Sequence, residues 1–270
     1  MKTLYISDLD GTLLNNASQI SEYTKNTLNS LIAKGMLFSV ATARGACTIM
    51  QLFNGISLNL PIVTLTGAII YDPVTNSFPV KNSISKTAID QICDCLATLH
   101  LNAFMQVAEK DEINVFYHSL KDDFEKFYVK RRNAKGFFNF KQIESLKNAT
   151  RFGEVVLISV MNTKPVIDNL LPFLQNISEI STITYREEGG SDNYYLEIFA
   201  KDVSKANAIK ELKSLCNIDE IIVFGDDIND LPMFKISNFS VATQNALPEV
   251  KAAANITIGT NETDSVAKWL

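Results

Sequence analysis

Two aspartates separated by one residue lie near the start of the chain, in the segment Asp8-Leu9-Asp10-Gly11-Thr12. The segment follows a β-like run from Thr3 to Ser7, which places both carboxylates at the carboxyl end of a strand. Such a pair suits phosphoryl transfer, because one carboxylate can attack phosphorus, the other can move a proton, and Mg²⁺ can hold the phosphate between them. The alternative is an ordinary Asp-Gly turn between two structural elements. Partner groups at the ends of later strands would favour the chemical interpretation.

The first part of the chain alternates strand signals with helix signals, which predicts βαβ crossovers and a parallel sheet. A helix is predicted from Ser21, with apolar residues at helical spacing and Gly35 at its end. The predicted strands cover residues 4–6, 37–41 and 62–65, and a second helix covers residues 46–53. Ligands of such a sheet bind outside the carboxyl ends of its strands.

The pattern changes near Lys81. Ser85 begins an amphipathic helix, and the neighbouring strands 103–107 and 113–117 are joined by a short charged turn. Such strands indicate an antiparallel or mixed α+β unit. From Ser204 the alternation of helices and strands returns. The sequence therefore predicts a discontinuous α/β domain, residues 1–82 and 190–270, with an α+β domain of residues 83–189 inserted into it.

Polar residues of the types that phosphate chemistry needs follow four of the predicted strands. They are Asp8 and Asp10, Thr42, Thr66 with Gly67, and the cluster of Asp226, Asp227, Asn229 and Asp230. Lys205, at the start of the helix before the last of these strands, adds a cation. Because the acidic cluster is dense, it requires a compensating cation, and Mg²⁺ suits carboxylates combined with phosphate oxygens.

Four segments of the chain together resemble a known family. Asp8-Leu9-Asp10-Gly11-Thr12, Ala41-Thr42-Ala43-Arg44, Ser204-Lys205 and the run Gly225 to Asp230 look like the four ordered motifs of haloacid dehalogenase-type phosphatases. The long insertion between the second and third motifs resembles the α/β cap of the Cof-like, type IIB branch. The resemblance covers essentially the whole chain. It implies a Rossmann-like core and a C2-type cap domain that determines substrate specificity.

The resemblance implies a role for each group at the strand ends. Asp8 would be the nucleophile that forms an aspartyl-phosphate. Asp10 would protonate the leaving oxygen and then activate water, with its backbone carbonyl also on Mg²⁺. Thr42 would hydrogen-bond the transferring phosphoryl group, and Lys205 would neutralise the charge that develops there.

The resemblance also assigns supporting groups. Asp226 would be the main second carboxylate on Mg²⁺, so that the expected metal ligands are Asp8, Asp10 and Asp226. Asn229 would orient the phosphate or the nucleophile. The other supporting residues are Asp227 and Asp230 around the metal, Arg44, which would orient its loop or pair with an acid, and Thr66 and Gly67.

Two positions depart from the family pattern. Ala43 replaces the glycine of the Thr-Gly-Arg motif that many relatives carry, and it should be tolerated unless that position needs a positive φ. Thr66 stands where many relatives have asparagine before the glycine, so a hydroxyl replaces an amide. We expect this second change to affect substrate contacts more than the phosphoryl step.

The composition limits the classes of function. With 270 residues, 46% apolar residues, a formal charge of −5 and a pI near 5.2, the chain is expected to be globular and gives no reason to expect nucleic-acid binding. Its four cysteines have no zinc-site spacing, and neither a signal segment nor an apolar run of membrane-spanning length is visible. A cytoplasmic monomer or weak homo-oligomer, without a membrane partner, is expected.

The expected function is that of a Mg²⁺-dependent phosphoric monoester hydrolase, a phosphatase acting on small phosphorylated metabolites, with sugar phosphates as the favoured class. Two alternatives stay open: a phosphotransferase or phosphomutase, and a non-enzymatic protein that binds phosphorylated metabolites on the same scaffold. In the inserted domain, the turn at residues 189–192 and the loop at residues 109–112 are candidate contacts for the leaving group.

Overall fold

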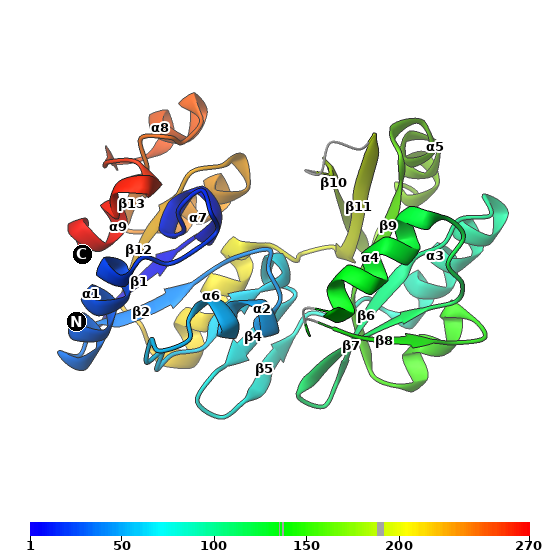
Figure 1. The fold of residues 1–270 in the computed structure, drawn as a ribbon, viewed down its shortest axis with the longest axis horizontal. Coiled ribbons are helices and arrows are strands. Elements are labelled where there is room, and N and C mark those ends of the chain that lie inside the picture. Colours follow the sequence, from blue (N-terminus) through cyan, green and yellow to red (C-terminus); the bar gives the residue numbers. More distant parts are fainter. Residues whose placement is uncertain (135, 137, 188–191) are drawn as a thin grey trace. The chain divides into compact units, whose positions relative to one another are not determined.

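A computed structural model describes residues 1–134, 136, 138–187 and 192–270. The chain forms two compact units. Unit 1 contains Met1–Val80 and Ser204–Leu270, and unit 2 contains Lys81–Val203. In Figure 1 unit 1 combines the blue and cyan N-terminal segments with the yellow to red C-terminal segments, whereas unit 2 is mainly green. The predicted insertion of one unit into the other is therefore present.

A parallel sheet forms the centre of unit 1. Its strand order is β14-β13-β12-β1-β2, and every neighbouring pair is parallel. The strands are β1 (Thr3–Ser7), β2 (Leu37–Val40), β12 (Glu220–Gly225), β13 (Phe239–Ala242) and β14 (Ile256–Thr257). Ser7 pairs with Phe224 on one side and Val40 on the other. The carboxyl ends of these three strands therefore lie at one edge, as the sequence predicts.

Helices cover both faces of this sheet because alternate strand residues point to opposite sides. Leu4 and Ile6 pack in one apolar cluster with Ile209 of α6 (Lys205–Cys216), together with side chains of α7 (Leu231–Ile236) and α8 (Pro248–Ala253). On the other side, Tyr5 lies against Trp269 of α9 (Ser265–Trp269), with ring centroids 6.5 Å apart. Helix α1 (Glu22–Ala33) contacts α9, and α2 (Ala46–Leu52) follows β2.

A small antiparallel sheet completes unit 1. It consists of β3 (Ile62–Thr64), β4 (Ile69–Asp72) and β5 (Ser77–Lys81). A parallel bridge between Ala41 and Val63 joins β3 to the end of β2. The sequence predicts β3 but neither β4 nor β5; in β5, Pro79 weakens the strand signal.

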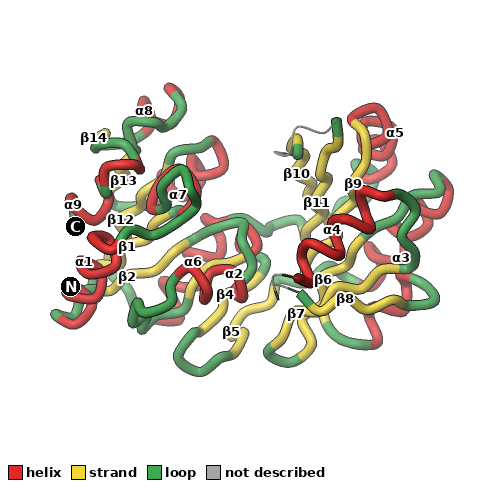
Figure 2. The backbone as a smooth tube through the Cα atoms, in the orientation of Figure 1, coloured by secondary structure: helices red, strands yellow, loops and turns green. Residues whose placement is uncertain are grey.

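Unit 2 is a six-stranded sheet with helices on both faces. Its order is β10-β11-β9-β6-β7-β8, antiparallel except for the parallel pair β7 and β8. The strands are β6 (Phe104–Glu109), β7 (Glu112–Tyr117), β8 (Asn139–Gln142), β9 (Glu154–Thr163), β10 (Ile180–Arg186) and β11 (Asn193–Ala200). Helices α3 (Lys86–Thr98) and α5 (Lys164–Leu174) pack on one face, and α4 (Asp123–Ala134) lies across the other, as Figures 1 and 2 show.

The second domain boundary differs from the prediction. The sequence places the return to the core at residue 190, whereas unit 2 extends to Val203. The reason is that β11 pairs with both β9 and β10, so it belongs to the sheet of unit 2. The first boundary lies at Val80, close to the predicted residue 82. No helix formed by the described residues is both long and apolar enough to cross a membrane.

Candidate active site

The end of β1 positions Asp8. The parallel pairing continues past the strand, because the Asp8 amide donates to the carbonyl of Phe224 over 2.9 Å. The chain then turns tightly through Leu9–Leu13, where Gly11 has a φ of 75°. A Cβ atom at Gly11 would lie 2.1 Å from Oδ2 of Asp226. Glycine is required there both for its positive φ and for the close approach of the turn to that carboxylate.

Lys205 joins two carboxylates at the buried centre of the site. Its Nζ lies 2.6 Å from Oδ1 of Asp8 and 2.7 Å from Oδ1 of Asp230, and the residue is only 3% exposed. Lys205 is the first residue of α6, whose N-cap Ser204 accepts a hydrogen bond from the amide of Asn207. Because the helix dipole disfavours a cation at this end, the two carboxylates provide the compensating charge.

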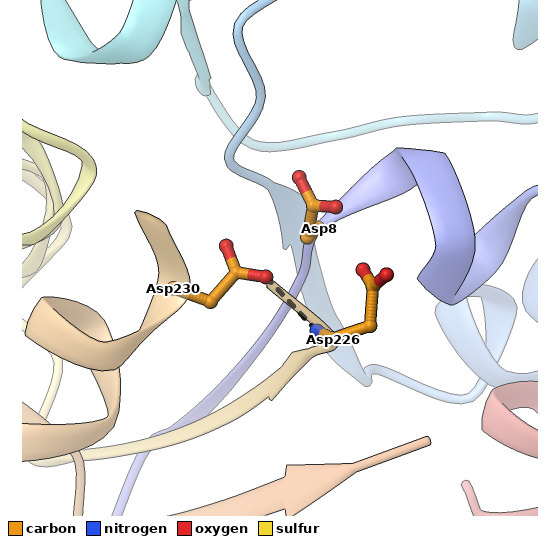
Figure 3. Close-up of side chains that lie close together, drawn as sticks. All are labelled: Asp8, Asp226 and Asp230. Atoms are coloured by element: carbon orange, nitrogen blue, oxygen red, sulfur yellow. Dashed lines mark hydrogen bonds between the residues drawn. The ribbon is translucent and has the colours of Figure 1, made fainter. Parts of the chain in front are cut away.

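Asp230 organises the loop after β12. Its Oδ2 accepts the backbone N–H groups of Asp226 over 2.9 Å and of Asp227 over 3.2 Å, as Figure 3 shows for Asp226. The side chain of Asp227 caps the amide of Ile228. A Cβ atom on Gly225 would lie 2.6 Å from Oδ2 of Asp230, so glycine also permits this packing. Asp230 therefore holds both Lys205 and the loop, and Asp227 has a local capping role.

Three carboxylates meet at this point and fit a metal site. Asp8, Asp226 and Asp230 each offer an oxygen, and these oxygens all lie within 4.8 Å of one another (Figure 3). Asp226 also accepts a hydrogen bond from the Thr12 hydroxyl over 2.7 Å. Since Asp230 already accepts from Lys205 and two amides, Asp8 and Asp226 are the better placed side-chain ligands. Carboxylate oxygens are the donors that Mg²⁺ prefers, so the residues present fit the ion.

The titration behaviour of these groups also indicates a need for positive charge. Burial raises the pKa of Asp8 to about 8, and the charges of Asp230 and Asp226 act in the same direction against the opposing ammonium of Lys205. Burial, followed by the Asp230 and Asp227 carboxylates, raises the pKa of Asp226 to about 6, although the Thr12 hydrogen bond opposes this. Burial lowers the pKa of Lys205, but the two carboxylates outweigh it and raise the pKa. A divalent cation would stabilise the ionised carboxylates.

Asp10 lies outside this cluster of carboxylates. Its side chain is 53% exposed and pairs with Arg44, whose Nε donates to Oδ2 over 2.8 Å. Of the two roles expected for Arg44, orienting its loop or pairing with an acid, the structure shows the second. The two aspartates of the Asp8-x-Asp10 pair therefore have different partners: Asp8 contacts Lys205, and Asp10 contacts Arg44.

Thr42 and Thr66 lie together beside the end of β2. The amide of Thr66 donates to the Thr42 carbonyl over 3.0 Å, and the Thr42 hydroxyl accepts from the amide of Arg44 over 3.2 Å. Ala43 does not have a positive φ, so the missing glycine causes no backbone strain. Thr66 does, with a φ of 60°. A Cβ atom on Gly67 would lie 2.3 Å from the Ser204 carbonyl oxygen, which shows how closely this turn approaches the start of α6.

Asn229 is exposed and its side chain makes no hydrogen bond within the described part of the chain. Sequence reasoning also missed two groups. One is Thr12, which holds Asp226 and was visible in the opening segment. The other is Asn245, whose amide donates to the Gly11 carbonyl over 2.7 Å and fixes the turn from a distant segment without a recognisable motif.

This arrangement matches a known family. A sequence model of the haloacid dehalogenase-like hydrolases matches residues 5–270. The chain belongs to the haloacid dehalogenase-like hydrolase family. The family resemblance, the α/β fold class and the prediction of a phosphatase are thereby confirmed, the last with the support of relatives that are named phosphatases.

Several proteins are similar to this haloacid dehalogenase-like hydrolase over nearly their whole length. The 5-amino-6-(5-phospho-D-ribitylamino)uracil phosphatase YitU of Bacillus subtilis is 26% identical over 97% of this chain and 94% of its own. A haloacid dehalogenase-like hydrolase from Bacteroides thetaiotaomicron has a TM-score of 0.81 at 22% identity, covering 100% of this chain and 98% of its own. A HAD subclass IIB sugar phosphatase has a TM-score of 0.71 at 20% identity, covering 100% and 97%. The two structures show the shared fold.

Proposed function

We propose that this hydrolase is a Mg²⁺-dependent phosphatase that acts on small phosphorylated metabolites through an aspartyl-phosphate. The observation that carries the proposal is the Lys205 ammonium between the carboxylates of Asp8 and Asp230, with Asp226 beside them, at the carboxyl ends of parallel strands. In this proposal Asp8 would be the nucleophile, Lys205 a fixed cation, and the carboxylate cluster would lie beside them. Phosphoryl transfer needs these three components.

The reaction would have two steps. In the first, an oxygen of Asp8 forms a bond to phosphorus, the bond from phosphorus to the substrate oxygen breaks, and Asp10 gives that oxygen a proton. In the second, Asp10 takes a proton from water, whose oxygen attacks phosphorus, and the bond to Asp8 breaks, which releases phosphate. In the structure the Asp10 carboxylate is paired with the Arg44 guanidinium, which would hold its orientation during these proton transfers.

Other groups would stabilise the transferred phosphoryl group. Lys205 is already fixed against the nucleophile and would neutralise negative charge, and Thr42 would donate from its hydroxyl. A Mg²⁺ ion held by Asp8, Asp226 and the Asp10 backbone carbonyl would neutralise charge on the phosphate. Asp230 and Asp227 would act by holding the loop.

The substrate class is proposed from the relatives. One is named for a phosphorylated ribityl compound, and another belongs to a sugar phosphatase subclass. We infer a phosphorylated sugar or polyol as substrate, with unit 2 as the source of specificity. A cytoplasmic location and a monomeric or weakly associated state are part of the same proposal.

The test is hydrolysis of p-nitrophenyl phosphate with Mg²⁺, with water as the only phosphoryl acceptor. Asp8→Asn should lower kcat by about a thousandfold or more, because the amide cannot act as the nucleophile. Asp219→Asn is the matched control, since Asp219 is exposed and its carboxylate accepts, among the described residues, one hydrogen bond, from the Lys2 amide. Full activity of Asp8→Asn would overturn the proposal. Transfer of phosphate to an added sugar in preference to water would favour the phosphotransferase instead.

A further inference from the structure

Residues 243–247, which connect β13 to α8, form hydrogen bonds to the turn that follows β1. We call these residues the bridging segment. The Thr243 hydroxyl donates to the Gly11 carbonyl over 3.3 Å, and the side-chain amide of Asn245 donates to the same oxygen over 2.7 Å. Gly11 directly follows Asp10, whose backbone carbonyl is one of the proposed Mg²⁺ ligands. The bridging segment therefore holds the turn at the residue next to a proposed ligand.

The bridging segment also forms hydrogen bonds to the end of β12 and the loop that follows it. The Leu247 amide donates to the Asp226 carbonyl over 3.0 Å, and the Thr243 amide donates to the Gly225 carbonyl over 3.3 Å. The carboxylate of Asp226 in turn accepts the Thr12 hydroxyl of the first turn over 2.7 Å. The segment therefore connects both loops that carry proposed metal ligands, although these loops are far apart in the sequence.

Asn245 is itself held in place by a second asparagine. Its Oδ1 accepts the backbone amide of Asn261 over 3.0 Å. Asn261 is buried, and its side chain donates to the Leu14 carbonyl over 2.9 Å and to Oδ1 of Asn16 over 3.1 Å, just past the turn. Asn245 is exposed, but its amide both donates and accepts, so its orientation is fixed. The two asparagines thus hold the turn at its centre and at its exit.

Groups that orient metal ligands contribute to metal affinity without touching the ion. If the ligands are ordered beforehand, none of the binding free energy is used to order them, and loss of such a supporting group typically weakens metal binding by about 10- to 100-fold. A hydrogen bond with a purely structural role differs in its effect. Its loss lowers the stability of the fold and leaves the metal affinity of the folded molecules unchanged. The two roles can therefore be distinguished by measurement.

We propose that Asn245 is a positioning residue that sets the affinity of the site for Mg²⁺. By holding the Gly11 carbonyl, it orders the Asp10 carbonyl and the Asp226 carboxylate before the ion binds. Without Asn245 the two loops are ordered in a smaller fraction of molecules, and the apparent affinity falls by that fraction. At saturating Mg²⁺ the loops are ordered again. This inference rests on the proposed function and adds to it a residue outside the four motifs.

The experiment is calorimetric titration of the metal-free protein with MgCl₂, without substrate. Asn245→Ala should raise the dissociation constant for Mg²⁺ by about tenfold. Asn29→Ala is the matched control, because Asn29 of α1 also donates to a backbone carbonyl, that of Gly55 over 2.8 Å, and accepts a backbone amide, that of Ser57 over 2.9 Å. This variant loses an equivalent pair of hydrogen bonds elsewhere in unit 1, and it should keep the wild-type dissociation constant.

Hydrolysis of p-nitrophenyl phosphate gives a second readout. For Asn245→Ala, the Mg²⁺ concentration at half-maximal rate should rise by the same factor, and excess Mg²⁺ should restore most of kcat. An unchanged dissociation constant would overturn the inference, as would an equal increase in Asn29→Ala. If Asn245→Ala weakens Mg²⁺ binding and no ester is hydrolysed, only the proposed function fails. If Asp8→Asn is inactive and Asn245→Ala binds Mg²⁺ like the wild type, only this inference fails.

Discussion

Arg44 holds the carboxylate of Asp10, with Nε donating to Oδ2 over 2.8 Å. The pair lies at the surface of unit 1, where Arg44 is 24% and Asp10 53% exposed in their side chains. We therefore expect Arg44 to set the orientation of Asp10, the proposed proton donor, rather than to bind phosphate directly.

Replacing Arg44 should affect substrates according to their leaving group. Arg44→Gln should lower kcat/KM for an alkyl phosphate about tenfold more than for p-nitrophenyl phosphate, because a stabilised phenolate leaves without a proton and an alkoxide does not. Arg44→Lys keeps the charge but not the two-pronged geometry, and it should give an intermediate ratio. Steady-state kinetics with both esters measure this. Equal losses for the two esters would contradict the orienting role.

Asp226 should lower the stability of the metal-free protein at alkaline pH. Burial and nearby carboxylates raise its pKa to about 6. The protonated Asp226 therefore adds fully to the free energy of unfolding below the ordinary carboxyl pKa, and this stabilisation is lost as the pH rises through about 6. Asp226→Asn removes the charge and keeps an acceptor for Thr12. At pH 8 with a chelator, this variant should be about 1–2 kcal/mol more stable than the wild type, and the difference should shrink at pH 5.

Adding Mg²⁺ should reverse the order of stability in that comparison. The wild type should gain melting temperature on addition of the ion, and Asp226→Asn should gain much less, because a ligand that binds only the folded state stabilises it. Thermal unfolding at both pH values, with Asp219→Asn as the exposed-carboxylate control, provides the measurement. The same melting response to Mg²⁺ in both proteins would exclude Asp226 as a ligand.

Gly11 and Gly35 offer a matched pair of substitutions. Both have a positive φ, 75° and 94°, but only at Gly11 would a Cβ atom meet the Asp226 carboxylate, whereas nothing lies within 4 Å at Gly35. Gly35→Ala should cost about 1 kcal/mol of stability from the backbone alone and leave activity intact. Gly11→Ala should cost about 3 kcal/mol and abolish most activity, because the turn and the carboxylate must move apart. Similar activities of the two variants would show that this close approach is unimportant.

Thr66 occupies a backbone conformation that suits another residue. Its φ of 60° is unfavourable for a β-branched side chain and is well tolerated by asparagine. Thr66→Asn should therefore raise the free energy of unfolding by about 0.5–1 kcal/mol, as measured by denaturant titration. Thr257→Asn, in the exposed strand β14, should bring no gain. A destabilised Thr66→Asn variant would mean that the hydroxyl has a structural role that outweighs the strain.

The sequence predicts the parallel sheet and the strand ends well, because both depend on local patterns. Strand β1 and the helix that begins after Ser21 follow from apolar spacing and capping, and the carboxyl ends of β1, β2 and β12 do meet at one edge. The positions of Asp8, Thr42 and Asp226 near that edge follow directly from this topology. The inserted unit is likewise visible as a change of pattern near Lys81.

The remaining features depend on distant partners, which no local pattern specifies. The sequence predicts the second boundary too early, because the pairing of β11 with β9 and β10 is a tertiary property. Asp230 is held by Lys205 from another element, so its structural role could not be separated from that of Asp226 within one acidic run. The expected contacts at residues 189–191 lie outside the described residues.

The pairing of β1 with β12 limits the order in which the molecule can assemble. Thr3 and Glu220, which pair at the start of these strands, are 217 residues apart in the chain, and all of unit 2 lies between them. Closing so long a loop is entropically costly, and a folded unit 2 would shorten the flexible part of it. We therefore expect Asp8 and Asp226 to come together only when both ends of the chain have joined. A chain cut within unit 2 should then lack the reactive centre unless the two pieces stay associated.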